Sequence, residues 1–186
     1  MIKWANGIGK NGIDYEEYLK NSANIGLLTH LLIGDYINKK DTDSAVLKTY
    51  KKEQIELANI YFNSFKKWYE TEEISPIVSE FSMVSKTLGF GGTCDFVFGD
   101  KDNKVVLVDF KTTTHIQKDY FIQMMAYSLL LKEKDIKVNK IAVLRFFPDG
   151  HVYKEMDVAE AKNRYYEYFM TCKNLFKAKK ELEKWE

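Results

Sequence analysis

The chain has 186 residues, of which 45% are hydrophobic and 15% aromatic, enough for the core of one domain. Its formal net charge of +1 does not by itself indicate nucleic-acid binding, and no apolar run or signal peptide indicates a membrane or an export route. Two cysteines, Cys94 and Cys172, are too few for a disulfide scaffold or a four-cysteine iron–sulfur cluster. The cytoplasm is therefore the expected location.

The N-terminal part of the chain, residues 14–70, is expected to be helical. Helical turns are expected from near Asp14, and a helix with Ser22 as a possible N-cap is expected to run to about Asn38. A second helix is expected from Ser44 to about Glu70, because apolar residues recur there at helical intervals. That packing stripe comprises Leu47, Gln54, Leu57, Tyr61, Phe65 and Trp68.

Strands and helices alternate through the central part, residues 74–154. The expected strands are Ile77–Ser85, Gly92–Phe98, Val105–Lys111 and Lys140–Phe147, with a helix from about His115 to Lys132 before the last of them and a hairpin partner at His151–Lys154 after it. Asp157 and Glu160 resemble a capping box that opens a last helix over 157–185. The expected buried stripe of this helix comprises Val158, Ala161, Tyr165, Tyr168, Cys172, Leu175 and Leu182.

The second and third of these strands are expected to form a hairpin that carries charged residues at its end. If the hairpin folds symmetrically about Asp102, Asp95 lies across from Asp109, and Lys111 shares a face with Asp109. An exposed salt bridge is the simpler interpretation of Asp-x-Lys alone. However, the apolar run Val105–Val108 predicts a strand buried on both faces, so charges at its end must be solvated, paired or bound to metal.

Two helices supply further candidate residues. Gln123 and Tyr127 are four apart on one helical face, a pattern that alone is typical of core packing. Gly26, His30 and Gly34 also recur every four residues, and the glycines leave room beside the histidine for a backbone or a ligand. A lone histidine on an apolar helix is more often a core residue than a ligand.

Taken in chain order, four short motifs resemble the RecB-like branch of the PD-(D/E)XK nuclease superfamily, which includes Cas4 nucleases and the mitochondrial genome maintenance exonuclease. They are Gly26-x-x-x-His30, Gly92-x-x-Asp95, Asp109-Phe110-Lys111 and Gln123-x-x-x-Tyr127. The resemblance implies a mixed α/β fold, the restriction-endonuclease-like αβββαβ core with a mixed central sheet flanked by helices. It also implies a variant without the Cas4 iron–sulfur cluster, and the proline of the superfamily name is absent before Asp95.

The resemblance implies a role for each motif residue. His30, Asp95, Asp109 and the backbone carbonyl of Phe110 are the implied ligands of Mg²⁺ or Mn²⁺. Lys111 is the implied catalytic ammonium. Gln123 and Tyr127 would position the DNA strand or brace the site. Relatives also carry a glutamate where this chain has Glu80, which either assists the metal site or is an ordinary strand glutamate.

The implied activity is metal-dependent hydrolysis of DNA by an exonuclease that prefers single-stranded ends, in recombination, repair or the processing of phage or mobile-element DNA. A phage-encoded protein would act in the host cytoplasm. With two arginines, Arg145 and Arg164, the chain favours lysine contacts to the backbone over base readout. Tyr120 and Phe121 are expected to offer base stacking. Two alternatives stay open: a nuclease-fold binding module with lost catalysis, and a nuclease subunit that needs a helicase or recombination partner.

Overall fold

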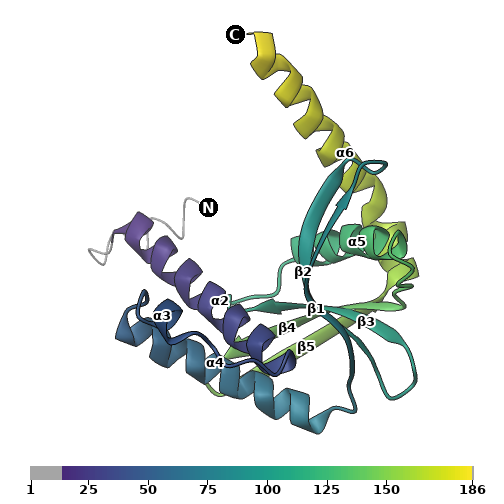
Figure 1. Ribbon diagram of the computed structural model, residues 1–186. Helices are drawn as coiled ribbons and strands as arrows, with labels where there is room; N and C mark the ends of the chain where they lie inside the picture. The colour runs from purple at the N-terminus through teal and green to yellow at the C-terminus, as the bar shows by residue number, and fades with distance from the viewer. Residues whose placement is uncertain (1–13, 186) are drawn as a thin grey trace.

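The computed structural model describes residues 14–185, which form a five-stranded sheet with helices on both faces (Figure 1). The strand order is β1-β2-β3-β4-β5, and β3 and β4 are parallel whereas the other neighbours are antiparallel. The strands are β1 (Ser75–Ser85), β2 (Phe90–Gly99), β3 (Val105–Lys111), β4 (Lys140–Phe147) and β5 (Gly150–Asp157). The predicted mixed sheet is thereby confirmed.

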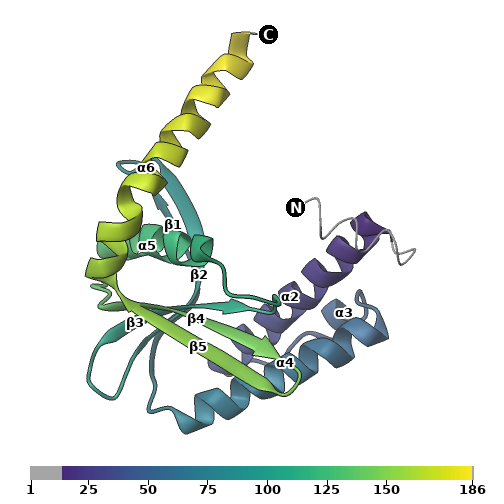
Figure 2. The same cartoon turned by 180° about the vertical axis from the view of Figure 1, so that it is seen from behind.

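Helices pack on the two faces in separate groups. α2 (Tyr15–Ile37), α3 (Ser44–Leu47) and α4 (Lys52–Thr71) precede the sheet, whereas α5 (Lys118–Lys132) and α6 (Val158–Leu182) lie on its other side, followed by a short 3₁₀ helix, η1 (Glu183–Trp185) (Figure 2). No helix within residues 14–185 combines the length and the apolar character needed to cross a bilayer.

Strand β3 is buried on both faces, as the apolar run predicts. Val106 and Val108 pack with Phe65 of α4 in one hydrophobic cluster, whereas Leu107 packs with Met124 of α5 in the other. Burial of this kind contributes about 25 cal/mol per Å² of apolar surface. The sheet is therefore a rigid platform, and the residues at the end of β3 are held in place from both sides.

Two helix boundaries differ from the predictions. α2 is one continuous helix capped by Asp14, whose Oδ1 accepts from the backbone N–H of Glu16 at 2.8 Å, so Ser22 lies inside the helix and is not its cap. The helix expected from Ser44 is interrupted between α3 and α4. There the side chain of Gln54 accepts a 2.9 Å hydrogen bond from the Lys51 N–H and holds the start of α4.

The predicted buried stripe of α6 is wrong beyond its first turns. Ala161 is buried, but Tyr168 is 59% exposed and Leu175 is 70% exposed, because the helix continues past the edge of the sheet (Figures 1 and 2). The capping box is also absent: Asp157 makes no side-chain cap hydrogen bond, and Glu160 pairs instead with Arg164 at 2.6 Å.

Candidate active site

The hairpin of β2 and β3 has the predicted register. In the turn, Asp100 Oδ1 accepts hydrogen bonds from the backbone N–H groups of Asp102 and Lys104, at 3.0 and 2.8 Å, which fixes how the two strands leave it. The last pair of the ladder is Phe96 with Val108. The next residues in this register are Asp95 and Asp109, which therefore lie level with each other at the end of the hairpin.

Asp95 does not continue the ladder through its backbone. Instead, its side-chain Oδ2 accepts a 2.7 Å hydrogen bond from the backbone N–H of Phe110 on β3. The other oxygen, Oδ1, lies 3.5 Å from His30 Nδ1 of α2. The Asp95 carboxylate therefore joins β3 to α2 at the point where the two strands separate.

Glu80 of β1 lies level with Asp95 on the other side. Its neighbours Ser79 and Phe81 pair with Phe96 and Cys94, but Glu80 itself has a φ of 50°. That left-handed conformation costs roughly 1–2 kcal/mol for a residue other than glycine. Val78 and Phe81 both pack on the face of the sheet that α5 covers, although they are three residues apart. In a regular strand such residues point to opposite faces, so β1 is irregular at Glu80.

Gly34 of α2 leaves room for the Glu80 side chain. A Cβ at position 34 would lie 3.1 Å from Glu80 Cγ, tighter than ordinary van der Waals contact. The glycine predicted to leave space beside His30 therefore does so for a carboxylate from a distant strand. Backbone strain at Glu80 and a glycine opposite it are together the pattern expected of a functional site.

His30, Glu80 and Asp95 bring their ligand atoms within 4.8 Å of one another. The second ring nitrogen of the histidine, Nε2, donates to the Phe110 carbonyl at 3.0 Å, so all four of these groups meet in one place. Two carboxylates, a carbonyl and an imidazole form a donor set that suits Mg²⁺ or Mn²⁺. The residues therefore fit a divalent cation.

The electrostatics of this group reflect crowded negative charge. Burial, followed by the charge of Asp95, raises the pKa of Glu80 to about 7. Burial lowers the pKa of His30, but the hydrogen bond and charge of Asp95 and the charge of Glu80 offset it, and the net pKa is raised. A cation would relieve the repulsion between the two carboxylates.

Asp109 and Lys111 form a buried ion pair next to this group. Asp109 is 6% exposed, and its Oδ2 lies 2.5 Å from Lys111 Nζ. Burial and then the nearby charge of Asp95 raise the pKa of Asp109, whereas Lys111 lowers it. The charge of Asp95 thus affects the pKa of Asp109, but Asp109 is not one of the three residues, His30, Glu80 and Asp95, whose ligand atoms lie within 4.8 Å of one another.

The two predicted residues of α5 interact with each other and with the hairpin. Gln123 Nε2 donates to the Tyr127 hydroxyl oxygen at 3.0 Å. The Tyr127 ring packs against Gly92, where a Cβ would come within 2.5 Å of its Cε1 atom. The Gly-x-x-Asp and Gln-x-x-x-Tyr motifs are therefore parts of one packing unit, since the glycine accommodates the tyrosine.

Tyr120, which the sequence indicated only for base stacking, contacts Lys111, and side-chain hydrogen bonds hold the loop that follows β3. Lys111 Nζ lies 4.8 Å from the centre of the Tyr120 ring, and the Tyr120 hydroxyl donates to Thr113 Oγ1 at 3.2 Å. Arg145, the β4 partner of Lys111 in the parallel ladder, donates to the Thr114 carbonyl at 3.0 Å. The loop between β3 and α5 has no periodicity, so only the strand register of Arg145 was a usable signal.

The expected base-stacking pair is not available as such. Phe121 is 6% exposed and packs in the core, which contradicts the prediction for this residue. Tyr120 is half-buried and its ring lies under the Lys111 ammonium.

Cys94, beside Asp95, is also buried, and burial is the main cause that raises the pKa of its thiol to about 12. That thiol is unsuited to nucleophilic chemistry.

The chain is an α/β protein whose mixed sheet ends in a group of two carboxylates and a histidine that could hold a metal ion, beside a lysine. The family model of the PD-(D/E)XK nuclease superfamily matches residues 12–185, and the chain belongs to that superfamily, whose members are generally metal-dependent nucleases. The sheet and flanking helices are consistent with the restriction-endonuclease-like fold.

Comparison with individual proteins adds little to this assignment. Among curated proteins, none matches the chain. Among solved structures, the crystal structure of SSO0001 is similar, with 15% identity over 78% of this chain and 74% of that chain and a TM-score of 0.36. The membership of the superfamily therefore rests on the family model.

Proposed function

We propose that the protein is a divalent-metal-dependent deoxyribonuclease. The observation that carries the proposal is the meeting of His30, Glu80 and Asp95 within 4.8 Å, beside the Asp109–Lys111 ion pair at the end of a buried strand. Hydrolysis adds water across one P–O ester bond and leaves a phosphate monoester and an alcohol. Superfamily membership supports this reaction class.

His30, Glu80 and Asp95 would hold the cation, with Asp109 and the Phe110 carbonyl as further ligands. A bound divalent cation lowers the pKa of its water and polarises the phosphoryl group. The imidazole ligand shifts the preference from Mg²⁺ towards Mn²⁺. Asp95 has a second task, because its hydrogen bond from the Phe110 N–H keeps the carbonyl of the same residue turned towards His30.

Lys111 is proposed as the group that stabilises negative charge developing on the phosphate or orients the attacking water. Its side chain is 19% exposed, so the ammonium is largely desolvated, and its electrostatic effect is stronger than in water. The Asp109 carboxylate and the Tyr120 ring hold it from two sides. A preorganised ammonium costs no rearrangement when the charge develops.

Gln123 and Tyr127 are proposed to position the DNA strand. Both lie on α5, their side chains are hydrogen-bonded to each other, and nearby Asp109 and Asp95 help to raise the pKa of Tyr127, although burial is the larger cause. A neutral phenol and amide beside the metal group are suited to phosphate or sugar contacts, because they add no further negative charge.

The rate of cleavage is the direct test of the proposed chemistry. Lys111→Ala is expected to remove cleavage while Mn²⁺ binding, measured by calorimetry, stays close to wild type. Lys101→Ala, in the exposed β2–β3 turn, is the matched control and should cleave normally. Full activity of Lys111→Ala would contradict the assignment, and DNA binding without cleavage in Mg²⁺ or Mn²⁺ would favour a non-catalytic module.

We further propose that the enzyme is an exonuclease that prefers single-stranded ends. Support comes from the motif resemblance to end-processing relatives and from the scarcity of arginines for base readout. End-labelled linear single-stranded DNA is expected to be degraded in Mn²⁺ and to survive in EDTA, whereas a single-stranded circle should resist. Equal rates on the circle and the linear strand would identify a non-specific endonuclease instead. Cleavage that appears only with an added helicase would identify a partner-dependent subunit.

A further inference from the structure

The distal half of α6 concentrates positive charge in a chain that is otherwise nearly neutral. Residues 168–180 contain four lysines and no acidic residue, whereas the whole chain has a formal net charge of only +1. Lys177, Lys179 and Lys180 are exposed. Such a local excess creates an attractive potential for a polyanion even when the total charge is close to zero.

The lysines are ordered along the helix. Lys173, Lys177 and Lys180 of α6 follow one another at intervals of four and three residues, so they form one stripe on the helical surface. The stripe is on the order of 10 Å long. An aromatic ring lies within it, because Lys180 Nζ is 5.4 Å from the centre of the exposed Phe176 ring. Basic side chains combined with an exposed aromatic ring are typical of surfaces that follow a single nucleic-acid strand.

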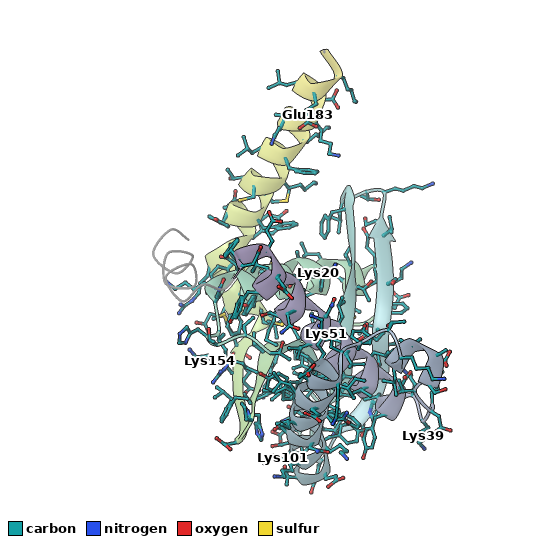
Figure 3. The ribbon with its side chains drawn as sticks, turned by 90° about the vertical axis from the view of Figure 1, so that its left-hand side faces the viewer. Lys20, Lys39, Lys51, Lys101, Lys154 and Glu183 are labelled. Atoms are coloured by element: carbon teal, nitrogen blue, oxygen red, sulfur yellow. The ribbon has the colours of Figure 1, made fainter. Side chains whose placement is uncertain are left out.

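The stripe begins at the tip of the β1–β2 hairpin and extends away from it. Phe169 of α6 packs against Phe90 with ring centres 5.0 Å apart, and Lys173 lies 5.9 Å from the same ring. Beyond this contact the helix projects past the hairpin, as all three views show (Figures 1, 2 and 3). Phe90 is five residues from Asp95 on β2, on the order of 17 Å along the strand. DNA that leaves the active site along the hairpin thus reaches the stripe within a few nucleotides.

We propose that the lysine stripe of α6 binds the phosphate backbone of the DNA substrate outside the active site. The inference rests on the proposed deoxyribonuclease function and extends its footprint. A second copy of the chain is the competing occupant, because Leu175 and Leu182 are each 70% exposed. Like charges on two copies of an acid-free lysine segment repel, which favours DNA over self-association.

The decisive experiment compares two triple variants with the same change in net charge. Lys173→Gln/Lys177→Gln/Lys180→Gln removes the stripe. Its control neutralises the exposed cluster at the end of α5 and in the loop after it, by Lys132→Gln/Lys134→Gln/Lys137→Gln. Binding of a fluorescent 30-nucleotide single strand is followed by anisotropy in EDTA, between 50 and 200 mM salt, so that no cleavage occurs.

The α6 variant is expected to bind on the order of several hundredfold more weakly at 50 mM salt, and its plot of log K against log [salt] should be less steep by about 2, since each lost phosphate contact changes the slope by about 0.7. The control variant should keep the wild-type slope. Equal slopes in the two variants would overturn the proposal. So would a wild-type dimer in sedimentation velocity that Leu175→Gln/Leu182→Gln dissociates.

The outcome for the stripe is separate from the outcome for the proposed function. Wild-type protein that binds DNA with the expected salt dependence but never cleaves it would refute the deoxyribonuclease and leave the stripe intact. Cleavage by the wild type, combined with unchanged binding by the α6 variant, would refute the stripe alone. A trinucleotide substrate adds a check, because it ends before the stripe and its cleavage should be equal in the wild type and the α6 variant.

Discussion

Gly92→Ala tests the packing that links the hairpin to α5. A Cβ at this position would lie 2.5 Å from Tyr127 Cε1, 2.7 Å from its hydroxyl oxygen and 2.8 Å from Cζ, all closer than atoms approach in proteins. The ring must therefore move, although its hydroxyl is held by Gln123. Overpacking of this kind costs about 1–3 kcal/mol. The restricted unfolded chain returns about 0.4–1 kcal/mol, so a net loss of about 1–2 kcal/mol is expected.

Equilibrium unfolding in urea measures this loss, and Gly99→Ala is the matched control on the same strand. There the nearest atom to a new Cβ is Ser75 Cβ at 3.7 Å, an ordinary contact, so the control should be neutral or slightly stabilised. In a Tyr127→Ala background, Gly92→Ala should cost little, which gives a coupling of about 1–2 kcal/mol in a double-mutant cycle. Cleavage by folded Gly92→Ala should fall, because the displaced ring also moves Gln123.

Two results would refute this reasoning. The first is a Gly92→Ala protein that equals Gly99→Ala in both urea midpoint and cleavage rate. The second is a loss of stability by Gly92→Ala that persists unchanged after Tyr127→Ala, which would place the strain in the hairpin backbone.

Three further predictions concern the charged groups of the site. His30→Ala should lower Mn²⁺ affinity and cleavage strongly while the melting temperature stays near wild type; a large drop in melting temperature with normal activity per folded molecule would make His30 a core residue. Tyr120→Leu should reduce kcat with little change in KM, because Lys111 loses the ring under its ammonium. Tyr120→Phe keeps the ring and should retain most of the wild-type rate. Equal kcat in the two variants would show that the ring does not contribute to the rate. The fold raises the pKa values of His30, Glu80 and Asp109, so their protonated forms stabilise it; this contribution is present at low pH and is lost as pH rises through the folded values. The melting temperature in EDTA should therefore fall between pH 5 and pH 8, and Mn²⁺ should restore it at pH 8; a flat profile in EDTA would contradict the raised pKa values.

The sequence predicted well the features that depend on neighbouring residues. The apolar run of β3 and the turn residues around Asp102 specify the hairpin and its register, and that register is enough to put Asp95 level with Asp109. The continuous α2 helix was partly missed because Asp14 and Ser22 are both acceptable caps. Only the side chain that actually reaches a backbone N–H distinguishes them.

The sequence could not predict the features that depend on distant contacts. The positive φ of Glu80 is held by packing against Gly34 of a helix more than forty residues earlier in the chain. The spacing of Tyr168 and Leu175 predicts an apolar helix face but not whether a partner covers it, which depends on where the sheet ends. The support of Lys111 by Tyr120 likewise depends on the path of a loop without periodicity.

The distorted strand β1 has a consequence for solubility. β1 is an edge strand, and the N–H and C=O groups along a long, straight edge invite pairing with other chains. Pro76, the register shift that follows it and the left-handed Glu80 divide this edge into short segments. The residue that directs a carboxylate towards His30 and Asp95 therefore also discourages intermolecular sheet growth. A β-branched replacement such as Glu80→Val would straighten the edge and is expected to promote aggregation as well as remove a proposed ligand.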